Sequence, residues 1–342
     1  MQQSTDWLDT ARVFAGVAVV VLHVASGVVI HQSSSSAEWW VGNFFDSSVR
    51  WCVPFFVMIS GALLLDNRKQ YVSFISFYKQ RVKRIALPLV SWSLFFSCWV
   101  GAKEYIKQGD INYVLIMINL IKGHPYSHLW YLFMLTGLYA FVPWLKILVS
   151  GLTERRLLGL LSLLFVIVII DNLAAYASGL GSMTNRQFFG LWFVWFLGYF
   201  FLGHYINSYA QTMASKRLLA SLFCTSLLIT AVGNYFAKEG MLSLGVYFYD
   251  YLSVNVVVMS ITFMLYVKQM PTNSWAKNYS VFVFGVYLVH PIFIDLFKFV
   301  GLSAERFNPI WSIPFFVLMV LICSIFTVRG LSKMPHLKRL VQ

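Results

Sequence analysis

Long apolar stretches follow one another along almost the whole chain of 342 residues. A helix of about 20 apolar residues is long enough to cross a lipid bilayer. To within a few residues, ten stretches qualify: 10–30, 44–65, 85–103, 128–149, 156–172, 188–206, 217–236, 246–267, 279–299 and 311–328. The fifth is the weakest, because its apolar core is short. Only 11% of the residues are charged, against about 25% in soluble domains. We therefore expect an all-α polytopic membrane protein with about ten transmembrane helices, formed as a single integral membrane domain over residues 1–342.

Basic residues are distributed unevenly between the connections. Most lie in the even-numbered connections and the C-terminal tail, whereas the first connection, which holds Glu38, has none. Lysine and arginine are enriched in cytoplasmic loops. We therefore expect both termini in the cytoplasm, and we interpret the net charge of +13 as this bias, not as a nucleic-acid site. The N-terminus lacks a basic region before its first apolar stretch, so we expect a retained helix and not a cleaved signal peptide.

The first apolar stretch carries ionisable residues on one face. His23 follows Arg12 by eleven residues, which is about three helical turns and roughly 16 Å of rise. Asp9 precedes Arg12 by three residues and shares its face. Ionisable residues inside a membrane span are costly and often functional, so Asp9, Arg12 and His23 are candidate catalytic residues. Two simpler interpretations stay open, an interfacial anchor for Arg12 and a bond to a neighbouring helix for His23.

Five short motifs occur in a fixed order along the chain. They are Asp9 to Arg12 with His23, Ser60-Gly61 in PFFVMISGALLL, Arg81 and Arg84 before Pro88 in RVKRIALPLV, HLWYL from His128, and His290-Pro291. This ordered set resembles the acyltransferase-three family of membrane O-acyltransferases. In its length the chain is similar to the single-domain form, without the periplasmic esterase-like domain of some relatives. Within the family it resembles the glycan O-acetyltransferases of the enterobacterial common antigen type.

The resemblance implies a reaction and its partners. Family members transfer an acyl group, usually acetyl from cytoplasmic acetyl-CoA, to a sugar hydroxyl, often in a surface polysaccharide. We therefore expect a multi-pass protein of the bacterial cytoplasmic (inner) membrane that uses acetyl-CoA and a glycan or lipid-linked sugar. No metal is expected, since the four cysteines lie far apart without metal-site spacing. No nucleic acid is expected either, since the basic residues cluster between apolar stretches.

The residues of the motifs suit this chemistry. Transfer to a hydroxyl needs a base, and a histidine titrates near neutral pH, so His23 is the candidate base. A transient acyl-histidine remains an alternative. Guanidinium groups bind phosphates bidentately, so Arg81 and Arg84 are candidates for the phosphates of coenzyme A, with Arg12 nearer the thioester. Ser60 and Gly61 would supply a hydroxyl or a close backbone approach to the same donor.

The remaining candidates are assigned to the acceptor. Arg50, His128 and Trp130 are expected toward the outer side, where Trp130 would stack on a sugar ring, and His290 lies midway along its helix. Each motif also has a structural interpretation. Arg81 and Arg84 are ordinary cytoplasmic charges by default, and Ser60-Gly61 is a small pair typical of helix packing.

Two other functions remain open from the sequence. Intramembrane arginine and histidine also suit a transporter or exporter of a glycan intermediate. Transporters often show two similar halves, and we find no such internal symmetry here. A scaffold subunit of a glycan-synthesis complex is a third possibility, but no sequence feature supports it.

Overall fold

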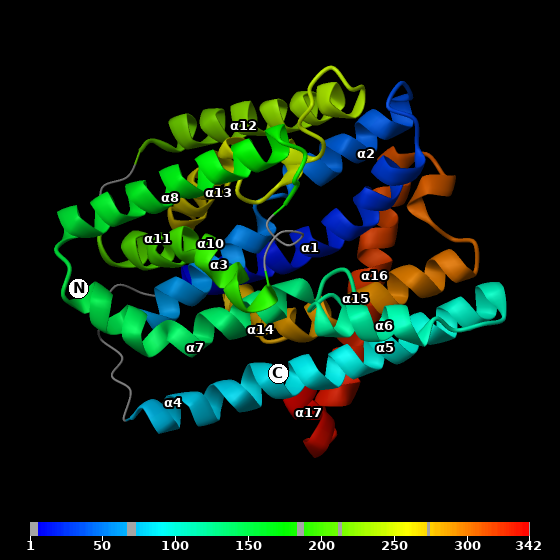
Figure 1. Cartoon of the computed structure of the whole chain (residues 1–342), viewed down its shortest axis with the longest axis horizontal. Helices are drawn as coiled ribbons and strands as arrows, with labels where there is room; N and C mark the ends of the chain where they lie inside the picture. The colour runs from blue at the N-terminus through cyan, green and yellow to red at the C-terminus, as the bar shows by residue number, and fades with distance from the viewer. Residues whose placement is uncertain (1–5, 67–72, 183–187, 211–213, 272–273, 342) are drawn as a thin grey trace.

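The computed structural model describes residues 6–66, 73–182, 188–210, 214–271 and 274–341, and these residues form helices without strands (Figure 1). The helices are α1 (Trp7–His31), α2 (Ala37–Ser48), α3 (Cys52–Leu64), α4 (Phe74–Arg81), η1 (Val82–Ala86), α5 (Leu87–Gln108), α6 (Tyr113–Ile121), α7 (Trp130–Ser150), α8 (Glu154–Ala177), η2 (Phe189–Leu191), α10 (Trp192–Trp195), α11 (Leu197–Ser208), α12 (Lys216–Lys238), η3 (Tyr247–Tyr249), α13 (Val254–Lys268), α14 (Ser274–Ser280), α15 (Val283–Phe299), η4 (Ala304–Arg306), α16 (Pro309–Ser332) and α17 (Pro335–Val341).

Among the described residues, nine helical segments are long and apolar enough to cross a membrane. A tenth is formed by Phe189–Trp195 and Leu197–Ser208, two helices bent by 44°. The prediction of an all-α polytopic membrane protein is therefore confirmed. The prediction that the fifth stretch is the weakest is wrong. Its helix covers Glu154–Ala177 with a mean hydropathy of 2.5, as high as that of α1, because apolar residues continue past Asp171.

Helix α1 lies in the middle of the bundle, between α12 and α13 on one side and α5 and α7 on the other (Figure 1). It packs directly against α2, α3, α13, α14, α15 and α16. Small residues allow this close approach. At Gly16, for example, an added Cβ would lie 2.7 Å from Cγ1 of Val283. The residues on α1 are consequently surrounded by elements from both the N-terminal and the C-terminal parts of the chain.

Two spans differ from the predicted stretches. The second begins at Ala37 and not at 44, and it is interrupted between α2 and α3. The third begins at Phe74 and not at 85, and it contains the π-helical turn η1 just before Pro88. Proline has no N–H to donate to the carbonyl oxygen four residues earlier, which here belongs to Arg84. The π-helical turn η1 lies at this interruption of the α-helical hydrogen bonds. Arg81 and Arg84 therefore lie within a continuous helical rod, not in a loop that precedes it.

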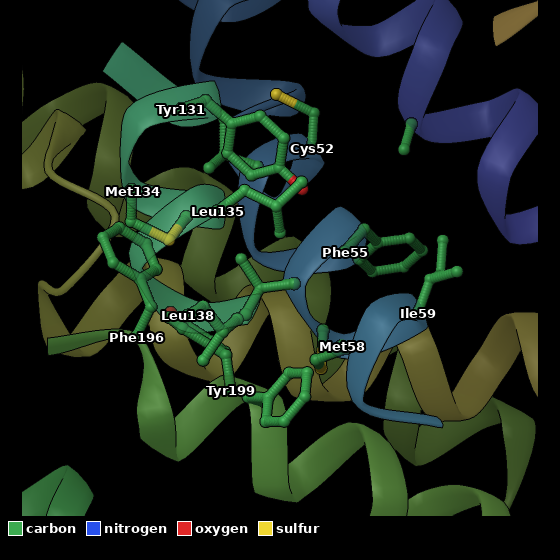
Figure 2. Close-up of a cluster of buried hydrophobic side chains, with 14 of the residues drawn as sticks. Cys52, Phe55, Met58, Ile59, Tyr131, Met134, Leu135, Leu138, Phe196 and Tyr199 are labelled. Carbon is green, nitrogen blue, oxygen red and sulfur yellow. The ribbon is translucent and has the colours of Figure 1, made fainter. Parts of the chain in front are cut away.

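The largest apolar core joins α3, α7 and the bent pair of α10 and α11. Figure 2 shows Met58 of α3 near Leu138 of α7, with Tyr199 of α11 beside them, while Phe55 points to the other side of α3. Met58, Leu138 and Tyr199 are completely buried. This core fixes α3 and α7 relative to each other, and both helices contribute side chains to the site described next.

Candidate active site

A cavity of about 600 Å³ contains four of the residues that the sequence singles out: Arg12, Ser60, Arg81 and Arg84. We call it the arginine pocket. Its other described lining residues are apolar or aromatic: Phe56, Ile59, Leu63, Leu64, Ile85, Tyr131, Leu135, Tyr139, Val281, Val283, Phe284 and Tyr287. The structure thus brings together side chains from α1, α3, α4, η1, α7 and α15.

The arginines of this pocket are held in different ways. Nη1 of Arg12 donates to Oδ1 of Asp9 over 2.7 Å, so the predicted Asp9–Arg12 contact is present. The guanidinium of Arg81 lies 5.2 Å from the ring centre of Phe77 and 5.6 Å from that of Tyr139, within cation–π range. Its Nε has no hydrogen-bond partner among the described residues. Arg84 is exposed at the edge of the rod.

The electrostatic character of the arginine pocket follows from its lining. The described lining residues include three guanidinium groups and no carboxylate. The hydroxyl groups of Ser60 and Tyr139 lie 3.2 Å apart and add neutral hydrogen-bonding capacity. A site of this charge and size favours an anionic ligand, and guanidinium groups match phosphate oxygens in particular.

Gly61 does not line the arginine pocket, although the sequence assigns it to the donor together with Ser60. An added Cβ at Gly61 would lie 1.8 Å from the carbonyl oxygen of Phe200, and one at Gly203 would lie 1.9 Å from that of Met58. The two glycines therefore allow the backbones of α3 and α11 to touch. The close approach predicted at Gly61 exists, but its partner is a helix, so this residue places Ser60 without contacting the ligand space.

Three histidines from different elements meet near the middle of the bundle. The ring centres of His23 and His290 lie 5.1 Å apart, and those of His290 and His128 lie 5.5 Å apart. We call these residues the histidine cluster. His128 and His290 are almost completely buried, and His23 is half-buried. No group of three or more histidine, cysteine or acidic side chains in the described parts of the chain is arranged to hold a metal ion.

The surroundings of His290 and His128 differ from the sequence expectation. Nδ1 of His290 lies 2.8 Å from the carbonyl oxygen of Tyr287, so Nδ1 carries the proton and Nε2 offers its lone pair. His128 is enclosed by the rings of Phe96, Tyr126 and Tyr287. Neither histidine lines an acceptor entry as we expected for His128. The hydroxyl of Tyr287 donates to the carbonyl oxygen of His128 and so connects the segment before α7 to α15.

A polar network anchors the segment before His128 to two helices. Oδ2 of Asp295 on α15 accepts from Tyr126 at 2.5 Å, from Trp99 at 2.8 Å and from Lys103 at 2.8 Å. Burial, and the hydrogen bond to Asp295, raise the pKa of Tyr126, so the phenol stays protonated and donates. Asp295 is only 17% exposed and forms an ion pair with Lys103. The network fixes the position from which His128 enters the cluster.

A second cavity, of about 720 Å³, contains Arg50 and Trp130. We call it the tryptophan pocket. Its described lining comes mainly from the ends of α1, α2, α7, α8 and α12 and the start of the segment before α13: Ser26, Val29, Ile30, Asp46, His124, Ser127, Tyr176, Ser182, Phe196, Asn234, Ala237, Lys238, Gly245, Val246, Tyr249, Asp250, Tyr251 and Leu252. The rings of Trp130 and Tyr251 are stacked, with centres 5.7 Å apart. Arg50 and Trp130 therefore lie together, as the sequence predicts, but His128 and His290 do not join them.

The described linings of the two pockets meet at the start of α7, and neither includes His23, His128 or His290. Trp130 lines the tryptophan pocket, and the next residue, Tyr131, lines the arginine pocket. On α1, Arg12 borders one cavity and Ser26 the other, about 21 Å apart along the helix, with His23 one turn from Ser26. The candidate base thus lies on the helix that connects both cavities.

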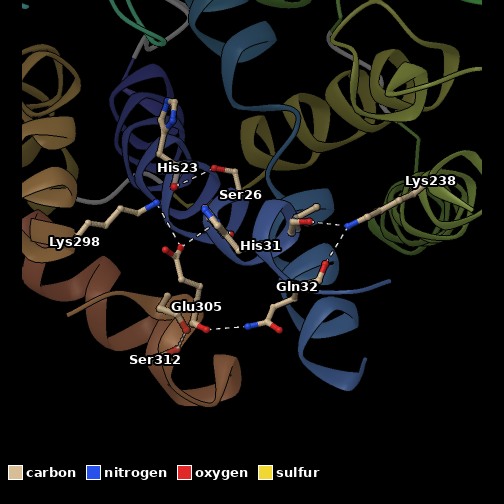
Figure 3. A network of polar contacts seen from close by, with 11 residues as sticks. His23, Ser26, His31, Gln32, Lys238, Lys298, Glu305 and Ser312 are labelled. Atoms are coloured by element: carbon tan, nitrogen blue, oxygen red, sulfur yellow. Dashed lines mark hydrogen bonds and ion pairs between the residues drawn. The ribbon is translucent and has the colours of Figure 1, made fainter. Parts of the chain in front are cut away.

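Polar contacts fix the end of α1 that borders the tryptophan pocket (Figure 3). Glu305 lies 3.6 Å from Nδ1 of His31 and 3.4 Å from Nζ of Lys298, and its carbonyl oxygen accepts from Gln32. On the opposite side, Lys238 donates to the carbonyl oxygens of Val29 and Gln32. Within α1, the hydroxyl of Ser26 donates to the carbonyl oxygen of His23. The turn that carries His23 is therefore attached to a rigid helix end.

Sequence reasoning missed several residues of the site. Asp46 forms an ion pair with Arg50 over 2.6 Å, and its spacing of four residues was a signal that could have identified it. Asp295 lies in a predicted membrane span, where an acidic residue is itself a functional signal. Tyr131, Tyr139 and Tyr251 carry no such signal, because aromatic residues are frequent along the whole chain.

These features define a multi-pass helical membrane protein with an arginine-lined cavity beside a buried histidine cluster. The chain belongs to the acyltransferase-three family, since the family model, described as an acyltransferase domain, matches residues 5–329. The family resemblance predicted from the motifs is confirmed, and the protein is a membrane acyltransferase by family. Neither the curated proteins nor the solved structures contain a match to the chain.

Proposed function

We propose that this protein is an acetyl-CoA-dependent O-acetyltransferase of the bacterial inner membrane. It transfers acetyl from the cytoplasmic donor to a hydroxyl of a cell-surface glycan or of its lipid-linked precursor. The single observation that supports this most is the arginine pocket, where three guanidinium groups and no carboxylate line a cavity at the level of η1. Coenzyme A carries a pyrophosphate and a 3′-phosphate, which are ligands of the kind that such a lining favours.

The donor is oriented by residues at different depths. Arg84, exposed at the edge of the rod, and Arg81 bind the phosphates. Arg12, held by Asp9, lies on α1 and contacts the pantetheine end near the thioester. Ser60 and Tyr139, whose hydroxyl groups lie 3.2 Å apart, donate to the thioester oxygen as negative charge develops there. The reactive carbonyl then points along α1 toward His23.

In this proposal His23 is the only base, and it both removes and returns the proton that moves during acyl transfer. The imidazole removes the proton of the acceptor hydroxyl while that oxygen attacks the thioester carbonyl carbon. The tetrahedral intermediate collapses, the carbon–sulfur bond breaks, and the imidazolium returns the proton to the departing thiolate. The products are an acetyl ester and free coenzyme A. His290 lies against His23 at 5.1 Å between ring centres and holds the orientation of that ring.

The acceptor enters from the tryptophan pocket in this proposal. That cavity borders the same helix about one turn beyond His23, on the side away from Arg12. Donor and acceptor therefore reach the base from opposite sides, and the acetyl group crosses the membrane without a free intermediate. The sugar stacks on Trp130, and Arg50 lies beside it.

Loss of a glycan acetyl group tests the function directly. Mass spectrometry compares the surface glycan from cells with and without this protein. Each acetyl ester adds about 42 Da, and these increments are expected only in cells that contain the protein. Purified protein in nanodiscs is expected to release free coenzyme A from acetyl-CoA when glycan is added. An exporter would instead change the amount of surface glycan without altering its acetylation, and that result would overturn the proposal.

A further inference from the structure

The two ends of the arginine pocket differ in chemistry. Its lining residues on α3 fall within 56–64 and those on α7 within 131–139, which is about 12 Å along each helix. The guanidinium of Arg81 marks one end, because it lies 5.6 Å from the centre of the Tyr139 ring. The other end of the cavity is therefore formed by the lining residue of α7 farthest from Tyr139, which is Tyr131.

Three aromatic rings, one from each of three helices, close that end. The ring centres of Phe56 on α3 and Tyr131 on α7 lie 6.1 Å apart, and those of Tyr131 and Tyr287 on α15 lie 5.8 Å apart. Both distances are within the range of aromatic pairs, about 4.5–7 Å. All three side chains line the cavity and keep part of their surface exposed, so a ligand can touch them. We call these residues the aromatic cap.

Helices α1 and α15 run parallel and in register beside the cavity. Gly16 of α1 lies against Val283 of α15. Seven residues further along each helix, the rings of His23 and His290 lie 5.1 Å apart. Positions on α1 can therefore be compared in depth with positions on α15.

The cations lie away from the aromatic cap. Arg12 is about one turn before the level of Gly16, and Tyr287 is about one turn beyond it, so about 12 Å of helix separates them. Side chains of a helix lean toward its N-terminus, and Nη1 of Arg12 donates to Asp9 on that side. Arg84 is exposed at the edge of the rod. The described lining thus has its cations toward one end and its aromatic cap at the other.

The aromatic cap borders the histidine cluster through Tyr287. The centre of this ring lies 5.2 Å from that of His128 and 6.3 Å from that of His290. Its hydroxyl donates to the carbonyl oxygen of His128, which holds the ring in place. His290 follows Tyr287 by three residues, about 5 Å along α15. A group that lies against the aromatic cap is therefore close to the level of His23.

We propose that the aromatic cap contacts the acyl group of the donor and restricts it to short, uncharged groups such as acetyl. The proposal rests on the proposed function for coenzyme A as the donor, and it adds Phe56, Tyr131 and Tyr287 as the residues that set acyl specificity. With the thioester beside Ser60, the acyl chain extends toward Phe56, one turn further along α3.

Size and charge are both selected at this end of the cavity. A longer acyl chain has to displace one of the three packed rings, and overfilling a packed site is costly. A charged group such as succinyl loses its hydration there, and the cations of the described lining lie toward the other end. Acetyl meets neither obstacle.

Competition binding of coenzyme A thioesters to the full chain in nanodiscs tests this selectivity without any acceptor. The probes are acetyl-, propionyl-, butyryl- and succinyl-coenzyme A, with coenzyme A itself as the reference. Acetyl-coenzyme A is expected to bind at least about tenfold more tightly than the butyryl and succinyl thioesters, since even one methylene gives about 10- to 200-fold discrimination in an apolar pocket. Equal or tighter binding of the butyryl or succinyl thioester would overturn the proposal.

Enlarging the aromatic cap supplies the second arm. Phe56→Ala is expected to improve binding of the butyryl thioester relative to the acetyl thioester by about tenfold, because the space of one ring becomes free. Succinyl should stay excluded, since no cation is added. Leu63→Ala shortens another lining side chain of α3, two turns nearer the arginines, and should leave the ratio unchanged. Phe326→Ala, at an exposed position of α16, controls for the loss of a phenyl ring.

An unchanged ratio in Phe56→Ala contradicts the assignment of the aromatic cap, as does an equal change in Leu63→Ala. If Phe56→Ala does not fold, Phe56→Leu makes a smaller opening and should shift the preference from acetyl toward propionyl. The thioester series with the unaltered protein decides in either case.

The outcomes separate this proposal from the proposed function. Binding of every thioester without preference would reject the aromatic cap and leave the acetyltransferase in place. Acyl selectivity that Phe56→Ala relaxes, in a protein that never acetylates the surface glycan, would keep the aromatic cap and reject the glycan as acceptor. Failure of all thioesters to bind would reject coenzyme A as the donor, and both proposals with it.

Discussion

The rings of His23 and His290 lie 5.1 Å apart at the centre of the bundle, although they belong to the first membrane span and to the ninth. Nδ1 of His290 is occupied by backbone carbonyl oxygens of its own helix. For His23, the hydrogen bond found within the described residues is to its backbone carbonyl oxygen, which accepts from Ser26. One histidine of the pair is thus fixed by its own helix, and the other is the base that we propose.

Replacing His23 by alanine is expected to lower the rate of acetyl transfer about 10²- to 10⁴-fold, because the hydroxyl proton then has no positioned acceptor. Binding of acetyl-CoA should persist, since the arginine pocket is unchanged. Release of coenzyme A from purified protein in nanodiscs measures the rate, and calorimetry measures binding. His336→Ala, an exposed histidine on α17, is the matched control. Full activity of a correctly inserted His23→Ala protein would contradict the role of this base.

Alanine at Arg81 or Arg84 is expected to raise KM for acetyl-CoA by about tenfold or more with little change in kcat, because a charged hydrogen bond to phosphate is lost. Acetyl-dephospho-CoA, which lacks the 3′-phosphate, identifies the partner of that group. The variant that no longer distinguishes the two donors has lost the 3′-phosphate contact. Arg155→Ala removes an exposed arginine elsewhere and should behave like the unaltered protein. An unchanged KM in both variants would reject the phosphate assignment.

Alanine at Gly61 or Gly203 is expected to destabilise the protein by more than about 1–3 kcal/mol, because the new methyl group meets backbone and not a movable side chain. Thermal unfolding in detergent, followed by size-exclusion chromatography, measures the effect. Gly159→Ala on α8 is the control, since an added Cβ there has no atom within 4 Å. Helix propensity makes that change neutral or stabilising by up to about 1 kcal/mol. Similar melting temperatures for all three variants would show that α3 and α11 do not cross so closely.

Asn at position 295 is expected to destabilise the protein by about 1–2 kcal/mol, because Lys103 loses its ionic partner in a half-buried position and Tyr126 loses a charged acceptor. The double variant Asp295→Asn with Lys103→Gln should recover part of the loss, since no unpaired ammonium remains. Asp110→Asn, exposed after α5, provides the control. Lys103→Gln alone completes the cycle. The melting temperature is measured for every variant, and a strictly additive double variant would show that the two side chains do not interact.

Cysteine labelling is expected to place the two pockets on opposite sides of the membrane. In a background without Cys52, Cys98, Cys224 and Cys323, cysteine at Ser26 should react with an impermeant thiol reagent from the outer side. Cysteine at Ser60 should react only from the cytoplasmic side, and acetyl-CoA should protect it. Labelling of both positions from the same side would contradict the separate entry of donor and acceptor.

The sequence by itself determined the class of fold and the family. Membrane spans are visible in a sequence because the bilayer requires long apolar helices, and most boundaries agree with the structure to within several residues. The Asp9–Arg12 contact also follows from the sequence, because residues three apart share a helix face. The family match over residues 5–329 confirms what the ordered motifs predict.

Only the tertiary structure decided which residues meet. It separates Ser60 from Gly61, placing one in the arginine pocket and the other against Phe200. It also moves His128 from an expected entry to a place beside His290. The physical reason is that local periodicity fixes the face on which a residue lies, whereas the neighbour of that face is set by how distant helices pack. A contact between α1 and α15 depends on every side chain packed between and around them, and no spacing along the chain records it.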